Sequence, residues 1–184
     1  MAEWHEVYGM DKDAFVGVPD KPVLVGHSAE KDALLRHVNS RKILCLIGEL
    51  GGGKTTMLKH VRSLGSVFGL KYVYYDCTPA VNHRDFSVRD VLRKHTGFLD
   101  RLLGRRVVLL VDEAHLLLPH VGSTAATGPL VEYAKLGRKP GCGLVLATQR
   151  PAATNDEILS QVDILIGHNL ALEDDMSALR RRMP

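Results

Sequence analysis

The chain has 184 residues, a net charge of +3 at pH 7 and 45% hydrophobic residues. This composition suits a single globular domain with a buried core and excludes a disordered chain. We expect no membrane contact, because no apolar run approaches the roughly 20 residues of a membrane span and the first residues do not resemble a secretion signal. The three cysteines form no C-x-x-C pair, which disfavours a zinc or disulfide framework and indicates reduced thiols in the cytoplasm.

Short apolar runs alternate along the chain with segments of helical pattern. We expect an N-terminal arm, 1–40, whose short helix at 29–38 is capped by Ser28 and packs on a core domain, 41–184. The predicted strands are 42–47, 71–75, 106–111, 143–147 and 163–166. Five helices are predicted in the core. The first carries an apolar stripe from Met57 to Phe68, the second begins at Ser87, and the third begins at Pro129. The fourth is capped by Asn155, and the fifth covers 173–182. Strands that alternate with helices predict an α/β fold, with a central parallel sheet and helices on both faces.

A glycine-rich stretch, "GELGGGKTT", follows the first predicted strand and precedes a helix. It contains the pattern G-x-x-x-x-G-K-T in the strand–loop–helix context that a phosphate-binding loop requires. Glycines let backbone N–H groups turn inward around a polyphosphate, and the helix N-terminus adds its dipole. Lys54 would contact the β- and γ-phosphates and Thr55 would ligate Mg²⁺. The predicted nucleotide-binding residues are Gly48, Glu49, Leu50, Gly51, Gly52, Gly53, Lys54, Thr55 and Thr56.

Two adjacent carboxylates, Asp112 and Glu113, end the third predicted strand in "RVVLLVDEAH". Strand C-termini of such a sheet face the ligand crevice, so Asp112 is expected to hold Mg²⁺ and Glu113 to deprotonate the attacking water. A glutamate beside the metal-binding aspartate favours ATP hydrolysis over a passive switch. His115 either couples the site to a neighbouring subunit or packs locally, and the sequence leaves both readings open.

Polar residues bracket the fourth predicted strand. Gln149, at its end, is expected near the γ-phosphate, and the alternative is a solvated side chain. Arg138 lies in the turn "GRKPG" at the other end, and a strand of about six residues spans roughly 20 Å. Arg138 is therefore too far from its own nucleotide and is either a solvated turn residue or an arginine finger for a neighbouring subunit.

The ordered combination "VDEAH", "GRKPG", "ATQRP" and "ILSQ" resembles the HerA/FtsK superfamily of DNA-pumping ATPases over about 42–182. The resemblance implies a RecA-like P-loop NTPase of the ASCE class with sheet order 5-1-4-3-2. It also implies a γ-phosphate sensor at Gln149, a trans-acting finger at Arg138, and a hexameric ring with double-stranded DNA in its pore. HerA proteins carry an N-terminal β-barrel for which this chain has no room, so it looks like the minimal packaging ATPases of viruses in the same superfamily.

We therefore expect a Mg²⁺-dependent ATPase that translocates double-stranded DNA, with viral genome packaging, in the host cytoplasm, as the first role. A HerA-like motor for repair or conjugation, and a non-pumping AAA-type ATPase or regulatory switch, are the alternatives. The partner would be a capsid protein in the first role and a nuclease in repair.

The segment 23–38 also resembles the N-terminal "VGR" segment of AAA-like ATPases, and this resemblance implies that it lies near the adenine of the bound nucleotide. Candidate DNA contacts lie in two loops, 82–94 and 119–128, and either may instead carry only solvated charges.

Overall fold

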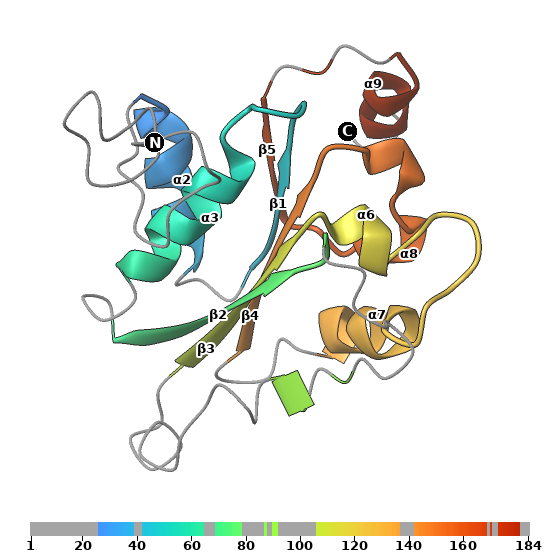
Figure 1. The fold of residues 1–184 in the computed structure, drawn as a ribbon, viewed down its shortest axis with the longest axis horizontal. Helices are drawn as coiled ribbons and strands as arrows, with labels where there is room; N and C mark the ends of the chain where they lie inside the picture. The colour runs from blue at the N-terminus through green and yellow to red at the C-terminus, as the bar shows by residue number, and fades with distance from the viewer. Residues whose placement is uncertain are drawn as a thin grey trace, which may run out of the picture.

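The structure is a computed structural model (Figure 1). The residues that it describes are 26–38, 42–64, 69–78, 87, 90–91, 106–136, 142–168, 170 and 173–180. The arm at 1–25, most of the helix expected after Ser87, and the "GRKPG" turn lie outside them. The division into an arm, 1–40, and a core, 41–184, stays a prediction.

A five-stranded parallel sheet forms the centre of the molecule, and its order is β2-β3-β4-β1-β5. Read from the other edge this is 5-1-4-3-2, so the predicted fold class and strand order are confirmed. The strands are β1 (Ile43–Ile47), β2 (Leu70–Asp76), β3 (Arg106–Asp112), β4 (Cys142–Thr148) and β5 (Ile164–Gly167). Each differs from its predicted span by one residue at one or both ends, which is within the usual uncertainty of strand boundaries.

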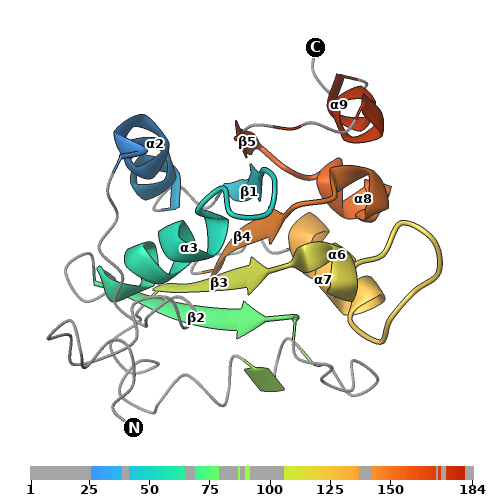
Figure 2. The same ribbon diagram turned by 45° about the horizontal axis from the view of Figure 1, so that its top comes forward.

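Helices cover both faces of this sheet (Figure 2). One face carries α2 (Ser28–Val38) and α3 (Lys54–Ser63); the other carries α6 (Ala114–Leu117), α7 (Thr127–Leu136), α8 (Asp156–Leu159) and α9 (Glu173–Arg180). Successive strand residues point to opposite faces. In β1, Leu44 and Leu46 accordingly pack with Met57 of α3, whereas Cys45 and Ile47 pack on the other side of the sheet. The interior strand β1 is therefore buried on both faces, which explains its uninterrupted apolar sequence.

Capping and proline signals in the sequence predicted the start of one helix correctly and the start of another wrongly. Asn155 caps α8 as expected, since its side chain accepts hydrogen bonds from the backbone N–H groups of Glu157 and Ile158. The prediction that Pro129 opens α7 is wrong, because the helix begins two residues earlier, at Thr127. Thr124 sets that start: its carbonyl accepts from the N–H of Thr127, and its own N–H donates to Thr127 Oγ1. Pro129 still falls in the first turn, where a missing N–H is tolerated.

None of the helices in the described part of the chain combines the length and the apolar character needed to cross a membrane.

Candidate functional site

Three neighbouring strands end together at one edge of the sheet, and the predicted site residues follow them. The last residue of β1, Ile47, is paired with Thr148 of β4, and Val111 of β3 is paired with Leu146. The phosphate loop after β1, the carboxylates at the end of β3 and Gln149 after β4 therefore emerge side by side. Ligands of open α/β sheets bind at this carboxyl edge.

The phosphate loop has the backbone that its glycines predict. Gly51 and Gly53 have φ angles of 80° and 79°, a left-handed conformation that other residues rarely adopt. Gly53 precedes the first turn of α3 and offers no side chain to cap it. The N–H groups at the start of α3 are thus free of a capping side chain, which is the arrangement that binds phosphate oxygens at helix N-termini.

Lys54 is buried and is held over the loop. Its Nζ donates hydrogen bonds of 2.8 Å to the carbonyl oxygens of Gly48 and Glu49. Burial lowers the pKa of Lys54, and the carboxylates of Glu113 and Asp112 act in the opposite direction. The ammonium group therefore lies between the loop backbone and the acidic end of β3, where a polyphosphate would meet both.

Asp112 is 2% exposed and accepts hydrogen bonds at both carboxylate oxygens. Tyr74 of β2 donates its hydroxyl to Oδ2 over 2.8 Å, and the backbone N–H of Glu113 donates to Oδ1 over 3.1 Å. Burial raises the pKa of Tyr74 strongly, and the Asp112 carboxylate raises it further, so the phenol stays protonated and donating. Sequence reasoning missed this contact, because nothing in "KYVYYD" indicates which tyrosine faces β3.

Glu113 adopts a left-handed φ of 51° at the start of α6, which turns it off the line of β3. Burial raises the pKa of Glu113, nearby Asp112 raises it further, and Lys54 partly opposes them. Its Oε2 is buried and has no hydrogen-bond partner among the described residues. A buried carboxylate oxygen without a donor is costly, so this atom is suited to accept a proton or a hydrogen bond from a bound water.

His115 links the ends of β3 and β4. Its Nδ1 lies 3.2 Å from Thr148 Oγ1 and 3.4 Å from Glu113 Oε2. Burial lowers the pKa of His115, and the cations of Arg150 and Lys54 lower it further. The ring is therefore neutral near pH 7, and its approach to Glu113 is not an ion pair at that pH. Of the two readings that the sequence left open, these contacts support the local one.

Polar contacts anchor the segment that carries Gln149. Thr148 Oγ1 accepts from the N–H of Arg150 over 3.1 Å, and Thr154 Oγ1 donates to the carbonyl of Arg150 over 2.9 Å. Asp175 of α9 is 3% exposed and accepts from the N–H of Ala152 over 2.8 Å. From the sequence, Asp175 was expected only to complement the helix dipole. Its burial shows that it instead joins α9 to the loop after β4.

Arg138 lies outside the described residues, so its position stays a prediction. The next strand, β4, has seven residues and spans about 23 Å. It begins with Cys142 at the sheet edge opposite Gln149. The length of β4 is therefore compatible with both predicted roles of Arg138, a solvated turn residue or an arginine finger for another subunit.

The donor atoms present fit a hard cation and a nucleotide. Thr55, in the first turn of α3, and Asp112, beside Lys54, supply a hydroxyl and a carboxylate, the oxygen ligands that Mg²⁺ prefers. The two groups that hydrogen-bond to Asp112 are neutral, and the nearby ammonium of Lys54 is the cation that attracts its carboxylate. A divalent cation next to Asp112 would add to this compensation of the buried carboxylate.

Comparison with known proteins agrees with this geometry. No protein-family model matches the chain. The "Probable DNA double-strand break repair helicase HerA" of Methanocaldococcus jannaschii is 29% identical over 131 residues, covering 70% of this chain and 24% of that protein. The HerA repair helicase of Pyrococcus furiosus is 37% identical over 60 residues, covering 33% of this chain and 11% of the relative. The fold of the genome packaging NTPase B204 of Sulfolobus turreted icosahedral virus 2, in complex with ATP-gammaS, covers 79% of this chain and 83% of that one, with a TM-score of 0.58 and 18% identity.

The chain has the fold of the P-loop NTPases that it matches. Its sequence similarity to HerA helicases is weak but consistent. The chain spans about a quarter or less of the length of these HerA relatives. A second structural match, the Aeropyrum pernix ORC2 protein, has a TM-score of 0.64 at 15% identity and covers 91% of this chain and 53% of that one. The structural matches show that the same fold occurs in different proteins whose structures contain adenine nucleotides or their analogues.

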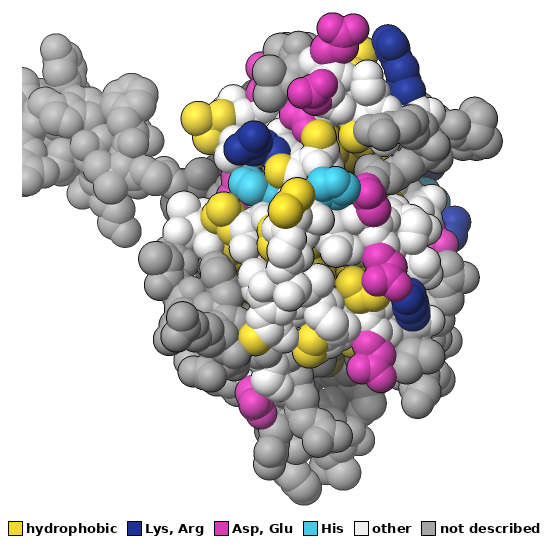
Figure 3. All heavy atoms as spheres, turned by 90° about the vertical axis from the view of Figure 1, so that its right-hand side faces the viewer, with side chains coloured by type: hydrophobic (Ala, Val, Ile, Leu, Met, Phe, Trp, Pro, Cys, Tyr) yellow, Lys and Arg dark blue, Asp and Glu magenta, His cyan; other side chains and the backbone are white. Residues whose placement is uncertain are grey.

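The face of the molecule that carries α6–α9 has no continuous basic patch in its described part. Hydrophobic side chains are scattered there around histidines, and acidic side chains follow one flank (Figure 3). Of the candidate DNA contacts, the loop at 82–94 is described only at Ser87, Asp90 and Val91. Thr124 uses its Oγ1 to donate to the carbonyl of Leu117 over 2.6 Å. Its hydroxyl therefore joins the segment before α7 to the end of α6, and Ser123, which is exposed, remains a candidate.

Proposed function

We propose that this protein hydrolyses ATP with Mg²⁺ at the carboxyl edge of the sheet. The observation that carries the proposal is the convergence of the phosphate loop, Lys54 and the Asp112–Glu113 pair, with a buried Glu113 oxygen that has no donor among the described residues. Backbone N–H groups of the loop and of the first turn of α3 would bind the phosphates, and Lys54 would neutralise their charge. Thr55 and Asp112 would hold Mg²⁺, which supplies further neutralisation of the phosphate oxygens.

Glu113 would act as the general base. Its raised pKa brings a carboxylate closer to the operating pH, which makes it a better proton acceptor than a solvated glutamate. Gln149, which directly follows the end of β4, would contact the γ-phosphate or the attacking water through its amide. The proposed order of contacts is therefore loop and Lys54 on the phosphates, Glu113 on the water, and Gln149 reporting whether the γ-phosphate is present.

Phosphate release measured with ATP and Mg²⁺ tests this proposal. We expect turnover by the unaltered chain and none by Lys54→Ala, because the variant loses the cation that contacts the phosphates. Lys59→Ala is a matched control, since Lys59 lies on the same helix and is positioned over the Tyr74 ring instead. Equal turnover by all three proteins would contradict the proposal.

We further propose that the ATPase assembles as a hexameric ring that translocates double-stranded DNA, with Arg138 completing the site of the next subunit. The support is the similarity to HerA helicases, together with the position of "GRKPG" before β4, at the edge opposite Gln149. Mixing Lys54→Ala with Arg138→Ala subunits tests the trans role. Recovery of ATPase activity in mixed rings is expected, because a ring then contains sites with an intact loop and a neighbour's intact arginine. Mixed rings that stay inactive would remove the trans assignment.

Viral genome packaging is the role we propose first, supported by the extent of the fold match to the packaging NTPase B204. A HerA-like motor in DNA repair is the second candidate, and the sequence similarity to the HerA repair helicases favours it. Binding to a capsid protein or to a nuclease, measured with purified partners encoded beside the gene, separates the two. An ATPase rate that duplex DNA leaves unchanged would instead favour a non-pumping AAA-type ATPase.

A further inference from the structure

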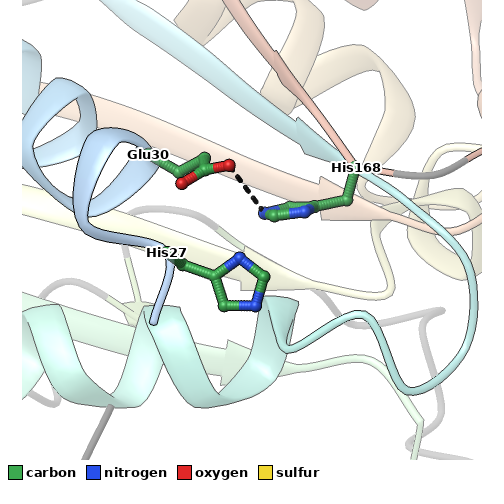
Figure 4. A group of neighbouring side chains, drawn as sticks. All are labelled: His27, Glu30 and His168. Carbon is green, nitrogen blue, oxygen red and sulfur yellow. Dashed lines mark ion pairs between the residues drawn. The ribbon is translucent and has the colours of Figure 1, made fainter. Parts of the chain in front are cut away.

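Beside the phosphate loop, on the side away from Asp112, three side chains with metal-ligating atoms converge (Figure 4). His27 directly precedes α2, Glu30 lies in its first turn, and His168 follows β5. One ligand atom from each residue lies within 4.8 Å of the other two. None of these residues belongs to the phosphate loop or to the Asp112–Glu113 pair, and we propose that they form a binding site for a divalent transition-metal ion of the Zn²⁺ class.

The nitrogen of His168 is the strongest indication of a missing ligand. Its Nε2 is buried and has no hydrogen-bond partner among the described residues. The carboxylate oxygen Glu30 Oε1 is 3.9 Å from this nitrogen, too far for a hydrogen bond. A metal ion between the two atoms would satisfy both, since it accepts one lone pair from the imidazole and one from the carboxylate.

The donor set selects the class of ion. Two imidazoles and one carboxylate match the preference of Zn²⁺ and similar ions for nitrogen and oxygen ligands. Mg²⁺ prefers oxygen ligands and keeps most of its water, so it suits Asp112 and Thr55 better than this cluster. Three protein ligands also leave a position for water, as is usual for a Zn²⁺ site that is not purely structural.

The frame that carries the ligands is firm, and the adjustment it requires is small. His168 donates its backbone N–H to the carbonyl of Ile47 over 2.7 Å, and an added Cβ on Gly48 would come within 2.8 Å of the His168 Cβ. The helix that carries Glu30 is anchored by Leu34, which is fully buried. Tetrahedral ligands of Zn²⁺ lie about 3.4 Å apart, whereas the three atoms now lie within 4.8 Å of one another, so each pair would have to approach by no more than about 1.4 Å.

Without a metal, packing between the two imidazole rings would account for this proximity. The rings of His27 and His168 meet edge to face, with centroids 4.4 Å apart, and a ring nitrogen of His27 points toward His168 (Figure 4). Ring packing alone predicts no metal affinity, so the two explanations differ in a measurable way. Occupied, the site would join the segment before α2 to the end of β5, next to the phosphate loop.

The experiment is titration of the untagged, chelator-treated chain with Zn²⁺ by calorimetry and with Co²⁺ by visible absorption, in the absence of nucleotide. We expect one ion per chain and no displacement by excess Mg²⁺. His168→Ala keeps the Cβ that packs on Gly48, and Glu30→Gln keeps the shape of the side chain. Each should weaken binding by at least about tenfold, as changes to metal sites typically do.

His120→Ala is the matched control, because His120 is an exposed histidine that lies after α6 and contacts Asp156. It should bind Zn²⁺ as the unaltered chain does. Zn²⁺ should also raise the thermal midpoint of the unaltered chain and of His120→Ala but not that of His168→Ala. Absence of binding, or equal binding by all variants, would overturn the proposal. Because no nucleotide is present, the outcome is independent of whether the chain hydrolyses ATP.

Discussion

The two sides of the phosphate loop differ in the atoms they offer. On one side, Asp112 and Glu113 present carboxylate oxygens at the end of β3, next to a tyrosine hydroxyl. On the other side, His27 and His168 present ring nitrogens with the single carboxylate of Glu30. Oxygen ligands suit Mg²⁺, and nitrogen ligands suit ions of the Zn²⁺ class. The two sides of the loop are therefore suited to different metal ions, so variants on one side should not change metal binding on the other.

The largest effect is expected on the side of the loop that carries Asp112 and Glu113 (the oxygen side), from Glu113→Gln. The amide cannot take a proton, so ATP hydrolysis should fall by a factor of about 10² to 10⁴ while nucleotide binding persists. Phosphate release and binding of a fluorescent ATP analogue measure the two quantities. Glu132→Gln, an exposed change on α7, is the control. A variant that turns over normally would remove Glu113 as the base.

Tyr74→Phe should have the next largest effect. It keeps the ring over which Lys59 and Arg62 lie but loses the hydroxyl that donates to Asp112. Loss of a group that orients a metal ligand typically weakens metal affinity about 10- to 100-fold, so the Mg²⁺ concentration for half-maximal ATPase activity should rise by that factor.

Tyr72→Phe is a close control for that experiment. The Tyr72 hydroxyl is buried without a hydrogen-bond partner among the described residues, and burial raises its pKa to about 12. Its removal should leave the Mg²⁺ requirement unchanged. If both variants behave alike, the Tyr74–Asp112 contact does not position the metal ligand.

Gly48→Ala changes the first residue of the phosphate loop, where the loop packs against His168. The new methyl group would lie 2.8 Å from the Cβ of His168, so the end of β1 or the residue after β5 must shift. Overpacking of this kind costs about 1–3 kcal/mol of unfolding free energy, which chemical denaturation can measure. Gly128→Ala is the control: it meets nothing within 4 Å and lies in the first turn of α7, so it should not destabilise the protein. Equal midpoints for Gly48→Ala and the unaltered chain would show that the loop and β5 adjust freely.

The smallest expected effect concerns pH and His115. Its pKa is lower in the folded protein than the ordinary value of about 6.5. As the pH falls below that value, the unfolded chain takes up a proton before the folded protein does, and stability decreases until the folded pKa is passed. His115→Asn, whose amide can still reach Thr148, should therefore lose less stability between about pH 7 and pH 5. Denaturation midpoints across that range test the sign, and parallel curves for the two proteins would contradict it.

Contiguous residues made much of the fold and of the oxygen side predictable. The apolar runs indicated five strands, and the glycines, Lys54 and Thr55 sit in one motif whose chemistry depends on local backbone. Asp112 and Glu113 were predictable because they directly end an apolar strand. The start of α7 was missed, because Thr124 acts through hydrogen bonds that compete with the signal of Pro129.

The sequence by itself determined the α/β class, the phosphate loop and the acidic strand end, since each depends on neighbours along the chain. The tertiary structure alone decided which distant side chains meet. Tyr74 reaches Asp112 because β2 lies beside β3, and His115 reaches Thr148 because β3 lies beside β4. His27 and His168 come together because α2 packs in the same core cluster as β5, which brings the residue before α2 close to the residue after β5. Strand order and helix placement set these distances, and no pattern of neighbouring residues encodes them.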